Sequence, residues 1–270
     1  MASRIQSLTV WLQANLAGRD LIFVGFWSEW AYLNKIFLEA FEGTKSPFVV
    51  LVDPADEATL KLKAPGLWNW AGAQETFKHV AASGADFLDE LRALFCRSFL
   101  NRLLAKSSPT YEALTGQKPK VTTFDVNLPT EDLFALRRDS CGKPAGQIAM
   151  EKRPTGSMSA AGAAHLLLLN REGTIDGGRY KIGSCRIRVV NGAGSLLSQS
   201  KGAFSQEPPA AEPDDFVICA GGEDDGGVPL NIVGRFSDVT IVRPGSSAQW
   251  LSVIKAAQMD FKEHDNANLG

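Results

Sequence analysis

The chain has 270 residues, of which 44% are hydrophobic and 21% are charged, as is typical of a soluble globular protein with one or two domains. Its net charge of −2 excludes a broad electrostatic attraction to nucleic acid or to an anionic membrane. It contains no apolar run of about 20 residues, the length that a membrane-spanning helix needs, and its four cysteines form no closely spaced pair.

The first predicted elements are a helix and a buried strand. Ser3 and Gln6 have the spacing of a capping box, and Gly18 suits the left-handed cap that ends a helix. Between these ends, apolar residues recur at helical spacing: Ile5, Leu8, Leu12 and Leu16. Residues 21–24 are all apolar, which predicts a strand buried on both faces, as in a parallel sheet.

A turn, a second helix and two more strands are predicted next. The first strand ends at residues 25–28, and Ser28 is the expected N-cap of a helix that ends at Gly43. Residues 48–52 predict a second buried strand, which stops at Asp53. A less regular stretch follows, and residues 76–80 predict a third strand.

A long helix is predicted to begin after Ser83. Ser83 and Asp86 have capping-box spacing, and acidic residues lie early in the helix and basic residues late, as the helix dipole favours. The apolar residues that we expect to face inward are Phe87, Leu88, Leu91, Leu94, Phe95, Phe99 and Leu103. Alternating strands and helices of this kind predict an α/β fold with a parallel sheet and right-handed crossovers.

In such a sheet, ligands bind beyond the carboxyl ends of the strands. At residues 25–28 a glycine lets the backbone approach a phosphate or a ribose, and a helix N-terminus supplies N–H donors. The carboxylate of Asp53 can accept hydrogen bonds from ribose hydroxyls. A glycine turn before a helix and an Asp-Pro pair after a strand are also common in turns that bind no ligand. The residues alone therefore leave open both a nucleotide site and a purely structural role.

Four segments, taken in order, resemble the C-terminal half of bacterial sirtuin-like NAD-binding domains. They are residues 20–30, 49–54, 77–80 and 83–88. The resemblance implies a partial Rossmann-like parallel sheet with helices over residues 1–118. A smaller α+β accessory domain is expected over residues 119–270.

The resemblance also implies NAD as the bound nucleotide and gives positions for it. The residues implied to contact NAD are Gly25, Phe26, Trp27, Ser28, Asp53, Gly84 and Asp86. Residues 25–28 would lie near the ribose and the phosphates, and Asp53 near the adenosine ribose. Gly84 and Asp86 would lie near the adenine.

The chain departs from the family pattern in features that bear on catalysis. A complete sirtuin-like domain begins with a strand, a Gly-Ala-Gly loop and a general-base histidine, and the matched segments follow all three. His79 lies in a predicted strand, on the wrong side of the loop to be that base, and no set of four cysteines for zinc is present. The expectation is therefore half of a catalytic domain, whose open sheet is completed by a second copy or by a protein partner.

The second half of the sequence predicts a linker and then further helices and strands. Residues 107–127 predict the linker, and Pro129 suits the first position of a short helix. Residues 159–169 fit a helix or a strand, and residues 247–259 predict a final helix. Strands are predicted at residues 186–190, 216–220, 231–233 and 239–242.

Several motifs in this half favour structural interpretations. Residues 192–194 read Gly-Ala-Gly after a strand, which allows a circularly permuted sirtuin-like domain, but Leu196 stands where the family has serine and a hairpin turn is simpler. The acidic run within residues 221–227 lacks calcium-loop spacing and indicates a solvated loop. His165 lies in an apolar run typical of a core residue, and Ser195 lacks the nucleophile-elbow pattern.

The resemblance implies the NAD-binding portion of a sirtuin-like NAD-consuming protein, of the NAD hydrolase type found in anti-phage defence. Without the missing half we expect no catalysis, and no catalytic residue is identified. The alternative is a non-catalytic binding or scaffold module that reuses a remnant of this fold. Scattered thiols and the lack of a signal-peptide pattern in residues 1–16 predict a cytoplasmic protein.

Overall fold

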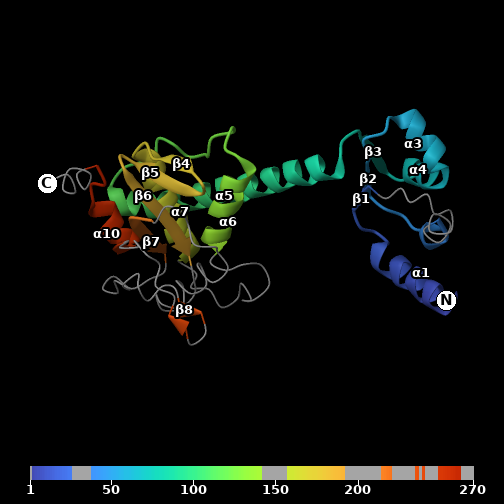
Figure 1. Ribbon diagram of the computed structural model, residues 1–270, viewed down its shortest axis with the longest axis horizontal. Helices are drawn as coiled ribbons and strands as arrows, with labels where there is room; N and C mark the ends of the chain where they lie inside the picture. Colours follow the sequence, from blue (N-terminus) through green and yellow to red (C-terminus); the bar gives the residue numbers. More distant parts are fainter. Residues whose placement is uncertain are drawn as a thin grey trace. The chain divides into compact units, whose positions relative to one another are not determined.

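The computed structural model describes residues 2–25, 38–141, 157–191, 214–220, 235–236, 239–240 and 249–262 (Figure 1). The chain forms two compact units, which we name unit 1 (Met1–Leu91) and unit 2 (Arg92–Gly270). They divide inside helix α5 (Gly84–Thr115), upstream of the boundary expected after residue 118. The predicted α/β fold class is confirmed, because unit 1 has a parallel sheet with helices and unit 2 a mixed sheet with helices.

Unit 1 is built on a three-stranded parallel sheet in the order β1-β2-β3. Its strands lie at the three predicted positions and are β1 (Leu21–Val24), β2 (Phe48–Val52) and β3 (Thr76–Val80). Val24 lies opposite Val52, and Val52 lies opposite Val80, so the three carboxyl ends are level. Helix α1 (Ala2–Leu16) precedes the sheet and is followed by Gly18, which has the expected left-handed φ of 71°.

Two short helices, α3 (Glu57–Lys63) and α4 (Pro65–Gly72), lie between β2 and β3. The irregular stretch expected there is therefore a wrong prediction, because helices this short show no clear hydrophobic period. Helices and strands of unit 1 share one core, formed by Leu21, Phe41, Val49, Leu51, Ala64, Leu67 and Ala71.

The strands of unit 1 differ in burial. Residues 49–52 of β2 are buried on both faces, as predicted, whereas Ile22 of β1 is 48% exposed, so the same prediction is wrong for β1. The reason is position, because β2 lies between two strands and β1 lies at the sheet edge. Within the described part of the chain no strand pairs with the outer side of β1, which leaves this edge open.

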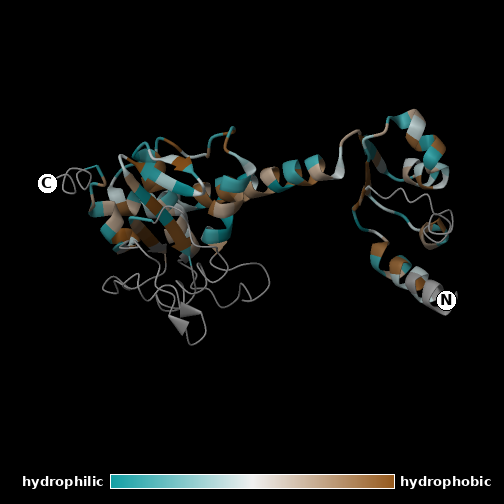
Figure 2. Ribbon diagram, viewed as in Figure 1, coloured by the Kyte–Doolittle hydropathy of each residue, from teal (hydrophilic) through white to brown (hydrophobic). Residues whose placement is uncertain are grey.

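Helix α5 begins directly after Ser83, as predicted, and both hydrophobic and hydrophilic residues occur along it (Figure 2). Its apolar residues do not all face inward. The expected inward orientation is wrong for four residues that are 41% to 58% exposed: Leu88, Leu91, Leu94 and Phe95. The buried face of the helix starts at Cys96 and continues with Leu100 and Leu104. A hydrophobic period therefore identified the helix without showing which stretch of it contacts a core.

The second half of α5 corrects the predicted linker. Residues 107–115 are helical, although Pro109 lies among them. Ser107 and Tyr111 are buried in unit 2. The prediction of a linker relied on the helix-breaking tendency of proline. Tertiary packing outweighs this local tendency.

Unit 2 contains a five-stranded mixed sheet in the order β10-β7-β6-β5-β4. Its strands are β4 (Thr174–Asp176), β5 (Arg179–Ile182), β6 (Cys185–Asn191), β7 (Phe216–Ala220) and β10 (Gln249–Ser252). β4, β5 and β6 form an antiparallel meander, whereas β6, β7 and β10 run parallel. The predicted strands that became β6 and β7 are confirmed. The hairpin turn expected after β6, at residues 192–194, lies outside the described residues.

A separate antiparallel pair is formed by β8 (Arg235–Phe236) and β9 (Val239–Thr240). It contains the start of the strand predicted at residues 239–242. The strand predicted at residues 231–233 lies outside the described residues.

Three helices of unit 2 accompany the sheet: α6 (Thr130–Cys141), α7 (Ser157–Asn170) and α10 (Val253–Gln258). α6 confirms the helix predicted near Pro129, and residues 159–169 are helical rather than extended. The single final helix predicted over residues 247–259 is partly wrong. Its first residues form β10 beside β7, and Ser252 then caps α10 by accepting a hydrogen bond from Lys255 N–H (3.2 Å).

Helices α5 and α7 approach closely at Gly162. A Cβ atom at this position would lie 2.0 Å from Ser107 Oγ and 2.9 Å from the carbonyl oxygen of Leu103. Real Cβ atoms do not approach other atoms so closely, so the crossing requires glycine. Buried apolar residues from α5, α6, α7, β5, β6 and β7 together form one hydrophobic core.

Candidate functional site

The carboxyl edge of the unit 1 sheet brings two predicted site residues side by side. Gly25 follows β1, and its N–H donates to the carbonyl oxygen of Val52 (3.2 Å). Asp53 follows β2, and its N–H donates to the carbonyl oxygen of Val80 (3.1 Å). Gly25 has a φ of 60°, a left-handed conformation that favours glycine. The parallel ladder thus continues one residue past β1 and one residue past β2.

One carboxylate oxygen of Asp53 accepts a hydrogen bond within the part of the chain that the structure describes, and the other does not. The residue is 4% exposed, and Oδ1 accepts a hydrogen bond from Ala55 N–H (2.7 Å), which forms an Asx turn. Among the described residues no donor reaches Oδ2. This oxygen can accept a hydrogen bond from a hydroxyl group of a ligand.

Gly84 places the start of α5 at the same edge. A Cβ atom at Gly84 would lie 2.7 Å from Cγ1 of Val24, the last residue of β1. Glycine is therefore needed for the helix N-terminus to approach the end of the strand. Gly25, Asp53 and Gly84 are brought together, as expected for a site at the carboxyl edge of a parallel sheet.

Asp86 has a structural role at this helix end. The hydroxyl of Ser83 donates to Asp86 Oδ2 (2.7 Å), and Asp86 N–H donates to Ser83 Oγ (3.1 Å). These bonds form the predicted Ser–Asp cap, which accounts for the residue without a ligand. The other three predicted contacts, Phe26, Trp27 and Ser28, lie outside the described residues.

His79 lies in β3 opposite Leu51, and its ring centroid is 5.7 Å from that of Trp68. The histidine therefore packs against Trp68 of α4. In the part of the chain that the structure describes, no cluster of three His, Cys, Asp or Glu residues is arranged to hold a metal ion.

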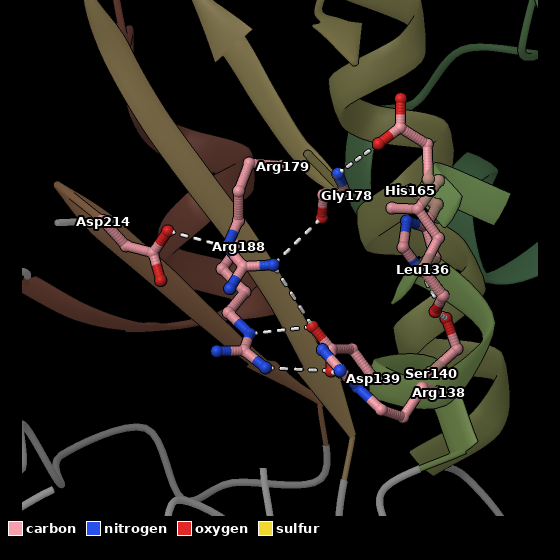
Figure 3. Close-up of polar contacts among 10 residues, drawn as sticks. Leu136, Arg138, Asp139, Ser140, His165, Gly178, Arg179, Arg188 and Asp214 are labelled. Carbon is pink, nitrogen blue, oxygen red and sulfur yellow. Dashed lines mark hydrogen bonds and ion pairs between the residues drawn. The ribbon is translucent and has the colours of Figure 1, made fainter. Parts of the chain in front are cut away.

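A buried charge cluster in unit 2 was not predicted from the sequence (Figure 3). Arg188 of β6 is fully buried and donates two hydrogen bonds to Asp139 of α6, from Nε to Oδ2 (2.8 Å) and from Nη2 to Oδ1 (2.9 Å). Arg179 of β5 pairs with Asp214 (2.8 Å) and lies 3.7 Å from Asp139. In the sequence, the one sign of a buried charge here is Arg188, which lies within the apolar run of β6.

The charges in this cluster determine the ionisation of its central acid. Burial alone would raise the pKa of Asp139, but the guanidinium groups of Arg188, Arg138 and Arg179 outweigh burial and hold this pKa below its usual value. The carboxylate stays ionised and joins α6 to β5 and β6. Removal of either Asp139 or Arg188 would therefore leave a buried charge without that partner.

A second buried network contains His165. Ser140 Oγ donates to the carbonyl oxygen of Leu136 (2.6 Å), so it accepts from His165 Nε2–H (2.7 Å), and Nδ1 accepts from the hydroxyl of Tyr180 (2.8 Å). Burial lowers the pKa of His165 to about 4 and raises that of Tyr180 well above its usual value. His165 is neutral and fully hydrogen-bonded, which confirms its interpretation as a core residue.

Comparison with family models, curated proteins and solved structures finds no match for the chain. The sirtuin-like resemblance therefore stays a prediction. In the described residues, no helix combines the length and the apolar character needed to cross a membrane.

Proposed function

We propose that the carboxyl edge of unit 1 binds NAD, with the adenosine ribose beside Asp53. The proposal rests on one observation above all. Gly25, with a left-handed φ, and Asp53, whose Oδ2 has no donor among the described residues, follow adjacent parallel strands. Parallel sheets bind nucleotides at this edge, and a buried acidic residue after the second strand suits ribose hydroxyls.

On this proposal the chain is the NAD-binding portion of a sirtuin-like NAD-consuming protein of the NAD hydrolase type, acting in anti-phage defence. Hydrolysis of the nicotinamide–ribose bond needs a general base and groups that stabilise a cation-like transition state. The only histidine of unit 1 is His79, which packs against Trp68. We therefore assign the base to a protein partner that completes the open sheet at β1.

The test is a titration of the purified chain with NAD, followed by tryptophan fluorescence, because Trp27 follows the turn at Gly25 in sequence. We expect saturable quenching in the wild type. Asp53→Asn keeps the Oδ1 acceptor for Ala55 N–H and replaces Oδ2 by an amide donor, so the Asx turn survives. The affinity should fall about tenfold, as expected for one lost hydrogen bond to a charged acceptor.

Asp56→Asn is the matched control. Asp56 lies three residues further along and caps α3 by accepting from Thr59 N–H (2.7 Å), a role that asparagine performs equally well. NAD affinity should be unchanged in this variant. Equal effects of the two substitutions, or no quenching at millimolar NAD, would refute the proposed site.

A second candidate function is a non-catalytic interaction module. It is favoured by exposed apolar side chains in unit 1, since Val10 is 61% exposed, Trp11 58% and Ile22 48%. These residues lie on α1 and on the edge strand β1. Absence of NAD binding together with an Ile22-dependent increase in molar mass, measured by light scattering, would favour this function over the first.

A further inference from the structure

Unit 2 contains a cavity of about 520 Å³ that the proposed function does not use. It is lined by the end of α7 and the turn after it, by Ile182 of β5 and by residues 258–262, all of which the structure describes. The side chains of Glu172 and Lys262 at this cavity are 86% and 63% exposed, so it is open to solvent. Cavities of about 300–1,000 Å³ are typical of sites for small molecules. The cavity is therefore both accessible and large enough for a small metabolite.

Arg171 gives the cavity a fixed positive charge. Its guanidinium donates hydrogen bonds to three carbonyl oxygens at and just after the end of α10, those of Ala256 (3.0 Å), Ala257 (2.6 Å) and Met259 (2.7 Å). The last carbonyl groups of a helix lack partners within the helix, and a cation stabilises them. The guanidinium also lies 5.6 Å from the ring centroid of Phe261. A guanidinium has five N–H groups, so these three bonds within the described chain leave two that can bind a carboxylate.

Glu172 gives the same cavity a carboxylate in an unusual backbone conformation. Its φ is 62°, and among the described residues it is the one residue other than glycine with a positive φ. Glu172 N–H donates to the carbonyl oxygen of Leu169 (3.2 Å), and Gly173 N–H donates to that of Leu168 (3.0 Å). These bonds form the Schellman motif that ends many helices, in which the position of Glu172 is usually glycine. The chain thus keeps a carboxylate at the cavity although glycine would be less strained there.

The charges that line the cavity are of both signs. Glu172 forms an ion pair with Lys262 (3.5 Å), and exposed pairs of this kind contribute little, so a ligand ammonium group can take the place of the lysine. Asp260 adds a second carboxylate to the lining, and its Oδ1 accepts a hydrogen bond from Lys262 N–H (2.9 Å). Together with Arg171, the lining contains two acidic and two basic side chains. Charge therefore favours a ligand that carries both signs.

We propose that this cavity binds an apolar α-amino acid. The carboxylate of the ligand accepts hydrogen bonds from Arg171, and its ammonium group binds Glu172. The rest of the lining suits an apolar side chain, because Ile182 and Phe261 belong to the core of unit 2 and Met259 packs against it. A phosphate or a nucleotide would instead bring several negative charges toward the two carboxylates of the lining.

The test is equilibrium dialysis of radiolabelled L-methionine against the full chain, because its flexible thioether side chain adapts to an irregular apolar surface. We expect one L-methionine per chain. Competition with two relatives of the probe tests each charge of the ligand. N-acetyl-L-methionine lacks the ammonium group and L-methioninamide lacks the carboxylate, so each should compete about tenfold less well than L-methionine.

Variants of Glu172 separate binding from a structural role. Glu172→Gln removes the charge that faces the ammonium group and should weaken L-methionine binding about tenfold. Glu172→Gly should also weaken binding but raise the urea midpoint of unfolding, because glycine adopts the left-handed conformation without strain. Glu131→Gln is the matched control, since Glu131 forms a comparable surface ion pair, is 75% exposed and does not line the cavity. Its affinity for L-methionine should equal that of the wild type.

Three results would overturn the proposal. They are absence of L-methionine binding at millimolar concentration, equal competition by all three compounds, and unchanged affinity in Glu172→Gln. A Glu172→Gly variant that gains stability with no loss of affinity would show that the carboxylate does not bind the ligand. These results are independent of NAD binding at Asp53, because the two residues lie in different units.

Discussion

Replacing Asp139 with asparagine should destabilise unit 2 strongly. Asparagine keeps the shape of the side chain but removes the charge that faces Arg188 and Arg179. These arginines are 0% and 8% exposed, so water cannot solvate them in place of the carboxylate. Removing one partner of a buried ion pair costs about 3–5 kcal/mol, and we expect the lower end because Arg179 keeps Asp214.

The pH dependence gives the same prediction a second test. The pKa of Asp139 is lowered in the folded state, so its stabilising effect is present above the pKa of the unfolded chain, about 4. It is lost as the pH falls through the lower folded-state pKa. The unfolding free energies of wild type and Asp139→Asn should therefore differ most near neutral pH and converge below about pH 4.

The assay is urea denaturation followed by circular dichroism, with hydrogen–deuterium exchange on peptides of α6 and β6 to assign the loss to unit 2. Glu131→Gln is the matched control, because Glu131 pairs with Arg92 at the surface and its side chain is 75% exposed. Exposed pairs contribute little. A loss for Asp139→Asn no larger than that of the control, or a difference that grows on acidification, would refute the reasoning.

Two further predictions concern the interior of unit 2. Gly162→Ala should destabilise the chain by about 1–3 kcal/mol through overpacking, since the new Cβ meets Ser107 Oγ at 2.0 Å, and adding Ser107→Ala should restore part of the loss in the same urea assay. Because burial lowers the pKa of His165 to about 4, the unfolded chain binds this proton first. Stability should therefore fall by about 3 kcal/mol as pH falls from about 6.5 to 4. His165→Gln should flatten urea-derived stability over that window, and an unchanged slope would contradict the assignment.

The sequence predicted those parts of the fold whose signals are local. Strands β1 and β2 are short apolar runs that end at Gly25 and at Asp53-Pro54, and the start of α5 is marked by Ser83 and Asp86. The candidate edge was also predictable, because the topology of a parallel sheet places the residues after its strands together. Gly25 and Asp53 lie there as the pattern required.

Features that depend on distant partners were not predictable. The strand β10 resembles the first turn of a helix in sequence and is extended because it pairs with β7. The first part of the linker expected at residues 107–127 is helical, up to Thr115, because Ser107 and Tyr111 are buried in unit 2. Arg188 is buried because Asp139, far away in sequence, supplies the compensating charge. In each case a partner outside the local window determines the structure.

The carboxyl edge of the unit 1 sheet combines an acidic acceptor with a glycine turn. Asp53 follows β2 and is 4% exposed, and Gly25 follows β1 with a left-handed φ of 60°. A carboxylate accepts hydrogen bonds from ribose hydroxyls, and glycine lets the backbone approach a phosphate. This pairing is the reason that a ligand with both a ribose and a diphosphate is favoured here. If Asp53→Asn and Asp56→Asn weakened NAD binding equally, the placement of the ribose beside Asp53 would fail.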